Sequence, residues 1–231
     1  MLQKIGILCA SDTELAPFLP HIQGVRTDSK AMLTFHTGRL GAWEVTAVYS
    51  GVGKVNAAVS AQLLIDAFGT TAVINAGTAG GLDEKVGLFD TVVTQRAAYH
   101  DMDEDILTDF HPWMETPFFP SDPRLLAAAR MAAAGAAHPI RFGDSVTGDT
   151  FVEGKRRAEI RRRFAPLSVD METAAAAQVC YVHKIPFLAV RTITDTAEAD
   201  GPDAFEKNCA RASAIAADFV RRLLDVLSAG K

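Results

Sequence analysis

Residues 53–75 read GKVNAAVSAQLLIDAFGTTAVIN, and this stretch decides the fold of the chain. Alanine and leucine recur at helical spacing over residues 53–68, which predicts a helix. The short apolar run AVIN, residues 72–75, ends at Gly77 and predicts a buried strand. Another such run, IGILCA at residues 5–10, ends in turn-forming residues and predicts a second buried strand. Buried strands interleaved with helices indicate a mixed or parallel sheet with helices on both faces.

The same pattern continues on both sides of this stretch. Residues 33–36 and 43–49 bracket two glycines and predict a hairpin. Further strands are predicted at residues 91–94, 140–145 and 187–192, and helices from about residue 13 and at residues 123–134, 172–183 and 205–228. The chain shows no internal repeat and no low-complexity linker. We therefore predict one three-layer αβα domain over residues 1–231, built around a central mixed sheet.

Composition limits the classes of partner. Apolar residues make up 48% of the 231 residues and charged residues 22%, as in a globular protein. The formal net charge of −5 speaks against nucleic acid as a partner, because its binders carry a basic patch. No segment approaches the roughly 20 apolar residues of a membrane helix. The cysteines at positions 9, 180 and 209 form neither a CxxC pair nor a zinc-ligand pattern, so we expect buried, reduced thiols and a cytoplasmic location.

Polar or acidic residues follow four of the predicted strands. They are residues 11–14, Thr78, residues 170–172 and residues 194–195. Ligands of α/β sheets bind beyond the carboxyl ends of the strands, so these positions are candidates for a site. Acids after strands are also common helix caps, and Asp12, Asp170 and Asp195 each allow that interpretation.

Six segments, taken together, resemble one protein family in order and spacing over nearly the whole chain. They are IGILCASDTELAPF, YSGVGKVNAA, VINAGTAGGL, VTGDTFV, VDMETAAAAQVC and VRTITDTAE. The family is that of the 5′-methylthioadenosine/S-adenosylhomocysteine nucleosidases. The resemblance implies a nucleoside phosphorylase-like fold and hydrolysis of an adenine nucleoside to adenine and a thioribose. It also implies a small nucleoside as the binding partner, with no cofactor and no metal.

By this resemblance, two acids carry the chemistry. Glu14 matches the acid that activates the attacking water, and Asp195 matches the acid that protonates the purine at N7. Met171 and Glu172 match the residues that hold the ribose. An N-glycosidic bond breaks through an oxocarbenium-like state, which parallels the two-carboxylate chemistry of glycosidases. Asp195 must therefore carry a proton when substrate is bound, whereas Glu14 must be ionised.

The remaining matched positions surround the substrate. Thr78 lies in a glycine-rich segment, interpreted as a turn, near the attacking water. Phe151 and Val152 match residues that stack on adenine and offer it backbone hydrogen bonds, although an aromatic residue such as Phe151 is equally typical of a core. Val52 and Phe205 match the apolar wall around the 5′-alkylthio group.

Three alternatives stay open. The first is phosphorolysis, against which Glu14 argues by repelling phosphate, and Asn75 stands where phosphorylases of this fold carry arginine. The second is a nucleosidase for another adenine nucleoside, such as 5′-deoxyadenosine or aminodeoxyfutalosine. The third is a nucleoside-binding protein without turnover, which would need neither Glu14 nor Asp195.

Four further segments carry predictions of their own. Residues 51–54 (GVGK) lack the spacing of a phosphate loop and predict a strand-to-helix turn. The acidic residues 100–105 are interpreted as a solvated surface rather than a metal site, and residues 155–163 (KRRAEIRRR) as the exposed face of a helix. Residues 99–122 are too irregular for a plain connection and predict a lid or a subunit contact, and we expect a homodimer.

Overall fold

A single ten-stranded sheet forms the centre of the computed structural model, which describes residues 2–196 and 201–229. The strands are β1 (Lys4–Cys9), β2 (Gln23–Lys30), β3 (Leu33–Leu40), β4 (Trp43–Tyr49), β5 (Ala72–Gly81), β6 (Thr91–Tyr99), β7 (Phe119–Pro120), β8 (Ile140–Thr147), β9 (Ser168–Asp170) and β10 (Phe187–Asp195). Parallel and antiparallel pairs both occur, which confirms the predicted mixed sheet. The last two residues of the segment VRTITDTAE, 197 and 198, lie outside the described residues.

The sheet closes on itself at one end. Strand β10 pairs parallel with β5 along one edge and antiparallel with β6 along the other. Because β6 also pairs with β8, β8 with β9 and β9 with β5, these five strands form a closed circuit. The sequence had suggested an open sheet instead of this closed circuit. Every residue of β10 is buried, since both its edges and both its faces are covered.

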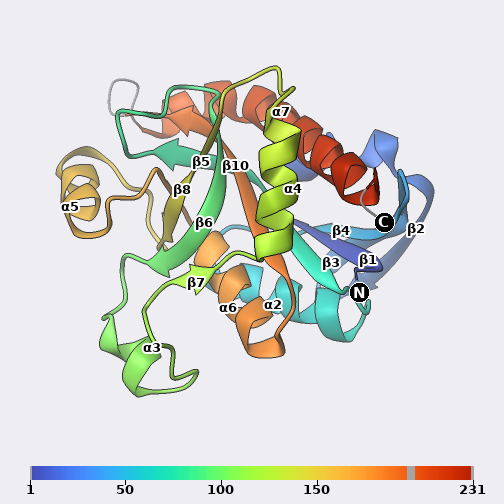
Figure 1. The fold of residues 1–231 in the computed structure, drawn as a ribbon, viewed down its shortest axis with the longest axis horizontal. Coiled ribbons are helices and arrows are strands. Elements are labelled where there is room, and N and C mark those ends of the chain that lie inside the picture. The colour runs from blue at the N-terminus through green and yellow to red at the C-terminus, as the bar shows by residue number, and fades with distance from the viewer. Residues whose placement is uncertain (1, 197–200, 230–231) are drawn as a thin grey trace.

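Helices cover both faces of the sheet (Figure 1). Helices α1 (Asp12–Leu15), α4 (Pro123–Ala133) and α7 (Pro202–Ala229) contribute to one hydrophobic core together with β1, β4, β5 and β10. Helices α2 (Lys54–Asp66) and α6 (Thr173–His183) form the second core on the opposite face. Helix α5 (Gly154–Phe164) lies beside β8, and the short helix α3 (Asp105–Asp109) lies within the irregular segment. The predicted layers are confirmed.

Among the strands that differ from the sequence prediction are β2 and β5. Strand β2 was not predicted, because its sequence QGVRTDSK has no apolar alternation and all eight residues are exposed at the edge of the sheet. Strand β5 continues through the glycine-rich segment to Gly81, so Thr78 lies within a strand and not in a turn. Among the described residues, no helix combines the length and apolar character needed to cross a lipid bilayer.

The strand-to-helix turn at residues 51–54 is confirmed. Strand β4 ends at Tyr49 and helix α2 begins at Lys54. Gly51 and Gly53 between them have φ values of +83° and +102°, a region in which residues with side chains are strained. This turn brings backbone N–H groups to the edge of the cavity described next.

Candidate active site

A cavity of about 230 Å³ opens at the carboxyl ends of β1, β5 and β10. The chain folds so that nine residues, spread from position 14 to position 205, line this one cavity. These residues are Glu14, Val52, Thr78, Phe151, Val152, Met171, Glu172, Asp195 and Phe205. They are the nine site residues named from the sequence, and the tertiary structure brings all of them together.

Glu14 is held rigidly in the wall of the cavity. Its side chain is buried, and Oε2 accepts a hydrogen bond from the backbone N–H of Ala10 at 2.6 Å. Oε1 accepts two more, from the backbone N–H of Thr78 at 2.7 Å and from the Thr78 hydroxyl at 2.8 Å. Three donors on one carboxylate stabilise its charged form. The charge required of a general base is therefore supported by the surrounding structure.

Asp195 lies at the end of β10 and has different partners. Oδ1 accepts a hydrogen bond from the Thr194 hydroxyl at 2.9 Å, and Oδ2 lies 3.0 Å from Nη1 of Arg157. Asp195 is 2% exposed and Arg157 6% exposed, so this is a buried ion pair. The prediction that residues 155–163 form an exposed helix face is therefore wrong for Arg157. Its position repeats with Ile160 and Phe164 on the buried side of α5.

Glu172 lies at the amino end of α6 and faces the turn before α2. Its Oε1 accepts a hydrogen bond from the backbone N–H of Gly53 at 2.9 Å, and its Oε2 lies 3.2 Å from Nη2 of Arg191. Burial raises the pKa of Glu172 to about 7; Arg191 opposes this rise, while the neighbouring charges of Asp170 and Glu14 add to it. The group that would accept the ribose hydroxyls thus titrates near neutral pH.

Arg191 is a charged residue of the site that the sequence analysis did not predict. It is wholly buried in β10, with ion-pair distances of 3.2 Å to Glu172, 3.4 Å to Asp170 and 3.8 Å to Glu14. Burial by itself lowers the pKa of Arg191, but the three carboxylates outweigh it and raise that pKa. An arginine directly after the apolar run FLAV, within a predicted strand, was the available signal. Arg191 holds three acids of the cavity wall together.

Asp170 and Asn75 belong to the same buried network. Asp170, the last residue of β9, accepts at Oδ1 from the backbone N–H groups of Glu172 and Thr173, whereas the N-cap residue of α6 is Glu172. Asn75 Oδ1 accepts from Nη2 of Arg191 at 2.7 Å. Both residues therefore orient Arg191 and the start of α6.

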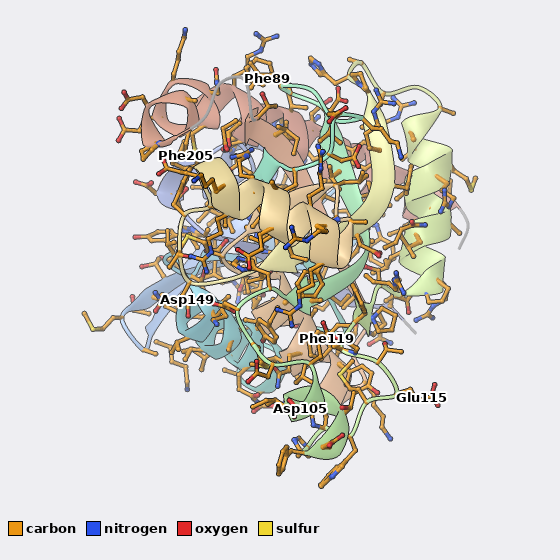
Figure 2. All side chains as sticks on the ribbon, turned by 90° about the vertical axis from the view of Figure 1, so that its left-hand side faces the viewer. Phe89, Asp105, Glu115, Phe119, Asp149 and Phe205 are labelled. Atoms are coloured by element: carbon orange, nitrogen blue, oxygen red, sulfur yellow. The ribbon has the colours of Figure 1, made fainter. Side chains whose placement is uncertain are left out.

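The remaining wall of the cavity is apolar and open to the surface. Val52 is 56% exposed and Phe151 41% exposed. The Phe151 and Phe205 rings meet edge to face, with centroids 6.3 Å apart. Figure 2 shows Phe205 beside the left-hand end of α5. Among the described residues that line the cavity there is no lysine or arginine. The cationic groups near the cavity therefore contact its lining acids without lining it themselves.

Comparison with known proteins identifies the family of this chain. Residues 4–225 match the model of the phosphorylase superfamily. A 5′-methylthioadenosine/S-adenosylhomocysteine nucleosidase from Staphylococcus saprophyticus is 34% identical over 228 residues, covering 96% of this chain and 100% of the relative. The chain belongs to the 5′-methylthioadenosine/S-adenosylhomocysteine nucleosidase family.

Solved structures agree with this assignment. The nucleosidase from Colwellia psychrerythraea in complex with adenine has a TM-score of 0.88 and 32% identity, with 98% of this chain and 96% of that chain covered. The futalosine hydrolase of Helicobacter pylori has a TM-score of 0.87 and 29% identity, with 97% and 98% covered. The predicted family and the nucleoside phosphorylase-like fold are confirmed.

Proposed function

We propose that this protein hydrolyses the N-glycosidic bond of 5′-methylthioadenosine and S-adenosylhomocysteine, releasing adenine and the corresponding thioribose. One observation carries the proposal: Glu14 and Asp195 are buried in one cavity with different partners. Glu14 accepts three hydrogen bonds, whereas Asp195 is contacted by one hydroxyl and one guanidinium. Two acids in unlike surroundings suit the roles of base and acid.

Glu14 serves as the general base in this proposal. A water molecule on the Glu14 side of the cavity would attack C1′ as the bond to adenine breaks, and the carboxylate would take its proton. Thr78 fixes the carboxylate through its N–H and hydroxyl. The positive charge of Arg191, 3.8 Å from Glu14, helps the carboxylate to remain ionised before the reaction.

Asp195 and Glu172 act on the two halves of the substrate. Asp195 donates a proton to N7, so that adenine leaves as a neutral base. Glu172, when ionised, accepts hydrogen bonds from both ribose hydroxyls and stabilises the developing sugar cation. Phe151 and Val152 flank the purine, and Met171 flanks the ribose.

The charge of the cavity favours hydrolysis over phosphorolysis. The acids Glu14, Asp170, Glu172 and Asp195 all line it. Arg191 lies behind these acids and is paired with three of them, so it offers little attraction to a phosphate dianion. A neutral water molecule meets no such repulsion.

Futalosine derivatives are the second substrate class to test. The structural neighbour from Helicobacter pylori is a futalosine hydrolase of almost the same TM-score. The exposed side chain of Val52 leaves the 5′ end of the cavity open, which gives room for a larger 5′ substituent. Adenine release from 5′-deoxyadenosine belongs to the same comparison.

Self-association is part of the proposal. Helices α2 and α6 expose Val55 (74%), Val59 (41%) and Val182 (40%), and the irregular segment exposes Phe110 (64%) and Trp113 (68%). Apolar surface of this extent is suited to a symmetric homodimer. Figure 2 shows Asp105 and Glu115 on the part of the irregular segment that projects from the body of the protein. A monomeric mass in light scattering at micromolar protein would contradict the dimer.

We also assign the protein to the cytoplasm. The cysteines at positions 9, 180 and 209 are all free and buried, as expected of a protein in a reducing compartment. Fractionation of producing cells, followed by an immunoblot, tests this assignment, and recovery outside the cytoplasmic fraction would overturn it.

Product analysis tests the function itself. The purified protein is incubated with methylthioadenosine, S-adenosylhomocysteine or a futalosine derivative, with and without phosphate, and the products are separated by chromatography. Free adenine and unphosphorylated thioribose are expected in both conditions. Formation of a ribose 1-phosphate derivative would overturn hydrolysis, and tight binding without adenine would indicate a nucleoside-binding protein.

A further inference from the structure

We propose that Arg157 is a positioning residue for Asp195: in the free enzyme its guanidinium holds the carboxylate ionised and in place, and adenine displaces this contact so that Asp195 takes up the proton for N7. This inference rests on the role proposed for Asp195 as the general acid. Arg157 itself need not touch the substrate.

The contacts of Arg157 join the parts of the site that meet the purine. Nη1 lies 3.0 Å from Oδ2 of Asp195 and donates a hydrogen bond to the carbonyl oxygen of Val152 at 3.1 Å. Nη2 donates to the carbonyl oxygen of Gly81 at the end of β5. One side chain from α5 therefore ties together the ends of β5 and β10 and the loop that carries Phe151.

The burial of Arg157 sets it apart from other arginines of α5. The side chains of Arg161 and Arg163 are 46% and 44% exposed, whereas that of Arg157 is 7% exposed. Removing a guanidinium from water costs several kcal/mol unless an acid and hydrogen-bond acceptors compensate. Arg157 occupies a position on the buried face of the helix where an apolar side chain would otherwise pack. Among the described residues, its compensating partners include Asp195 and the carbonyl oxygens of Val152 and Gly81, which lie at the active site.

The ion pair is incompatible with the chemistry until it weakens. A carboxylate beside a guanidinium is stabilised as the anion, but only the neutral acid can protonate N7. Both oxygens of Asp195 are occupied, Oδ1 by the Thr194 hydroxyl and Oδ2 by Arg157. Each carboxylate oxygen can accept two hydrogen bonds, so N7 can approach an oxygen that already has a partner, but the guanidinium opposes the neutral acid that N7 requires. The approach of the base therefore coincides with loss of the guanidinium contact.

The other charges around Asp195 favour proton uptake once that contact is lost. Glu14, Asp170 and Glu172 line the same cavity, and each opposes a further negative charge. From α7, the side-chain amide of Asn208 donates to the carbonyl oxygen of Thr194 and adds no charge. In this proposal solvent supplies the proton.

Over one turnover the enzyme takes up and releases the same number of protons. Asp195 gains a proton from solvent and passes it to N7 as the electron pair of the C1′–N9 bond moves into adenine. Water forms the new bond to C1′ and gives its proton to Glu14, which returns it to solvent. Asp195, again a carboxylate, then re-forms its pair with Arg157.

The first experiment compares pH profiles of kcat/KM for methylthioadenosine. In Arg157→Met the alkaline limb is expected to move upward by about one to three pH units, the usual effect of removing an adjacent cation from a carboxyl. Arg157→Lys, which keeps the charge, is expected to stay near the wild-type limb. Arg161→Met, the same substitution one turn along α5 at an exposed site, is the matched control and leaves the profile unchanged.

Two results of this experiment would have different meanings. A lower kcat in Arg157→Met with an unmoved alkaline limb means that Arg157 only supports the fold, which overturns the inference. Absence of adenine release by the wild type would instead overturn the proposed function.

A second experiment needs no variant of Arg157. Free adenine is titrated calorimetrically into the wild-type protein above neutral pH, in buffers of different ionisation enthalpy. Uptake of about one proton per bound adenine is expected, because protonation is linked to binding. Asp195→Asn should abolish the uptake. Binding of adenine to the wild type without proton uptake would show that Asp195 is already neutral in the free protein and would overturn the inference.

Discussion

The Cα of Gly77 lies so close to Glu14 that a Cβ at this position would overlap the carboxyl carbon and both carboxylate oxygens. Gly80, three residues further along β5, stands in the same relation to Asp195: a Cβ there would lie 2.9 Å from Oδ2. The glycines of β5 thus leave room for the two acids proposed to carry the reaction.

Gly77→Ala is expected to displace Glu14 from the position in which Thr78 holds it. Because positioned general base catalysis contributes roughly 10²–10⁴ in rate, kcat should fall by a comparable factor. Steady-state assays of adenine release measure the change. Gly87→Ala, where a Cβ would meet no atom within 4 Å, is the matched control. Near wild-type activity in Gly77→Ala would show that Glu14 tolerates displacement and is not the base.

Glu14→Gln is expected to abolish hydrolysis while leaving the fold intact, since the amide retains the shape of the carboxylate but cannot accept the proton of water. Added phosphate should not restore bond cleavage, because the remaining acids still repel a dianion. Chromatography of the products with and without phosphate measures both effects. Recovery of activity in phosphate would mean that the cavity accepts phosphate as the nucleophile.

Asp195→Asn is expected to abolish adenine release while the affinity for an unreactive substrate analogue stays within about tenfold of wild type, because general acid assistance contributes roughly 10²–10⁴ in rate. The rate comes from single-turnover assays and the affinity from calorimetry. Undiminished turnover would remove Asp195 from the mechanism.

Recognition of the ribose should depend on pH through Glu172. With its pKa at about 7, Glu172 is ionised above that pH and can accept hydrogen bonds from both ribose hydroxyls. The affinity ratio between an unreactive riboside and its 2′-deoxy counterpart should therefore rise with pH through about 7, reaching roughly tenfold to hundredfold. The ratio cancels effects that both ligands share. In Glu172→Gln it should stay constant, and a constant ratio in the wild type would contradict the role of Glu172.

Glu172 also affects the free energy of unfolding, and the direction of its pH dependence follows from the raised pKa. Folding raises the pKa of Glu172 from its ordinary value of 4.5 to about 7, so the native state binds the proton more tightly than the unfolded state. Its stabilising contribution is fully present below pH 4.5 and is lost as the pH rises toward 7. Denaturant titrations of wild type and Glu172→Gln across this window should show the difference in unfolding free energy changing in that direction.

Substrate selectivity should follow the division between the polar ribose end and the apolar 5′ end. We expect kcat/KM to rank methylthioadenosine above adenosine and adenosine above 2′-deoxyadenosine, with adenosine 5′-monophosphate last. Filling the apolar pocket at Val52 and Phe205 contributes about 1–3 kcal/mol, and loss of a ribose hydroxyl costs about the same. Phe205→Ala should lower the preference for methylthioadenosine over adenosine. A monophosphate that proved the best substrate would contradict the placement of Val52 and Phe205.

Much of the fold could be predicted because its apolar runs are short, strongly patterned and bounded by glycine or polar residues. Strand β1, helix α2 and the first half of β5 were predicted within a few residues. Strand β2 was missed because an exposed edge strand needs no apolar face. The closure of the sheet through β10 was missed because strand pairing depends on neighbours far away in the sequence.

The residues of the candidate site likewise fall into those that the sequence predicted and those that it missed. Motif resemblance placed Glu14, Glu172 and Asp195, since each follows or ends a recognisable strand. It passed over Arg157 and Arg191, whose importance comes from what they contact and not from the residues next to them. Arg157 stands in a basic run that is typical of a solvated helix, and only the tertiary structure shows that its side chain is buried and reaches Gly81 and Asp195 at the ends of β5 and β10.

The sequence by itself determined most of the buried strands and the longer helices, and which acids lie at the strand ends, because both follow from local pattern. The tertiary structure decided how those acids are charged and held, because burial and ion pairing depend on segments far apart in the chain. The pKa of Glu172 is raised to about 7 because the fold buries it near Asp170 and Glu14, while Arg191 opposes the rise. Asp195 meets a guanidinium only because the fold brings Arg157 of α5 to the end of β10.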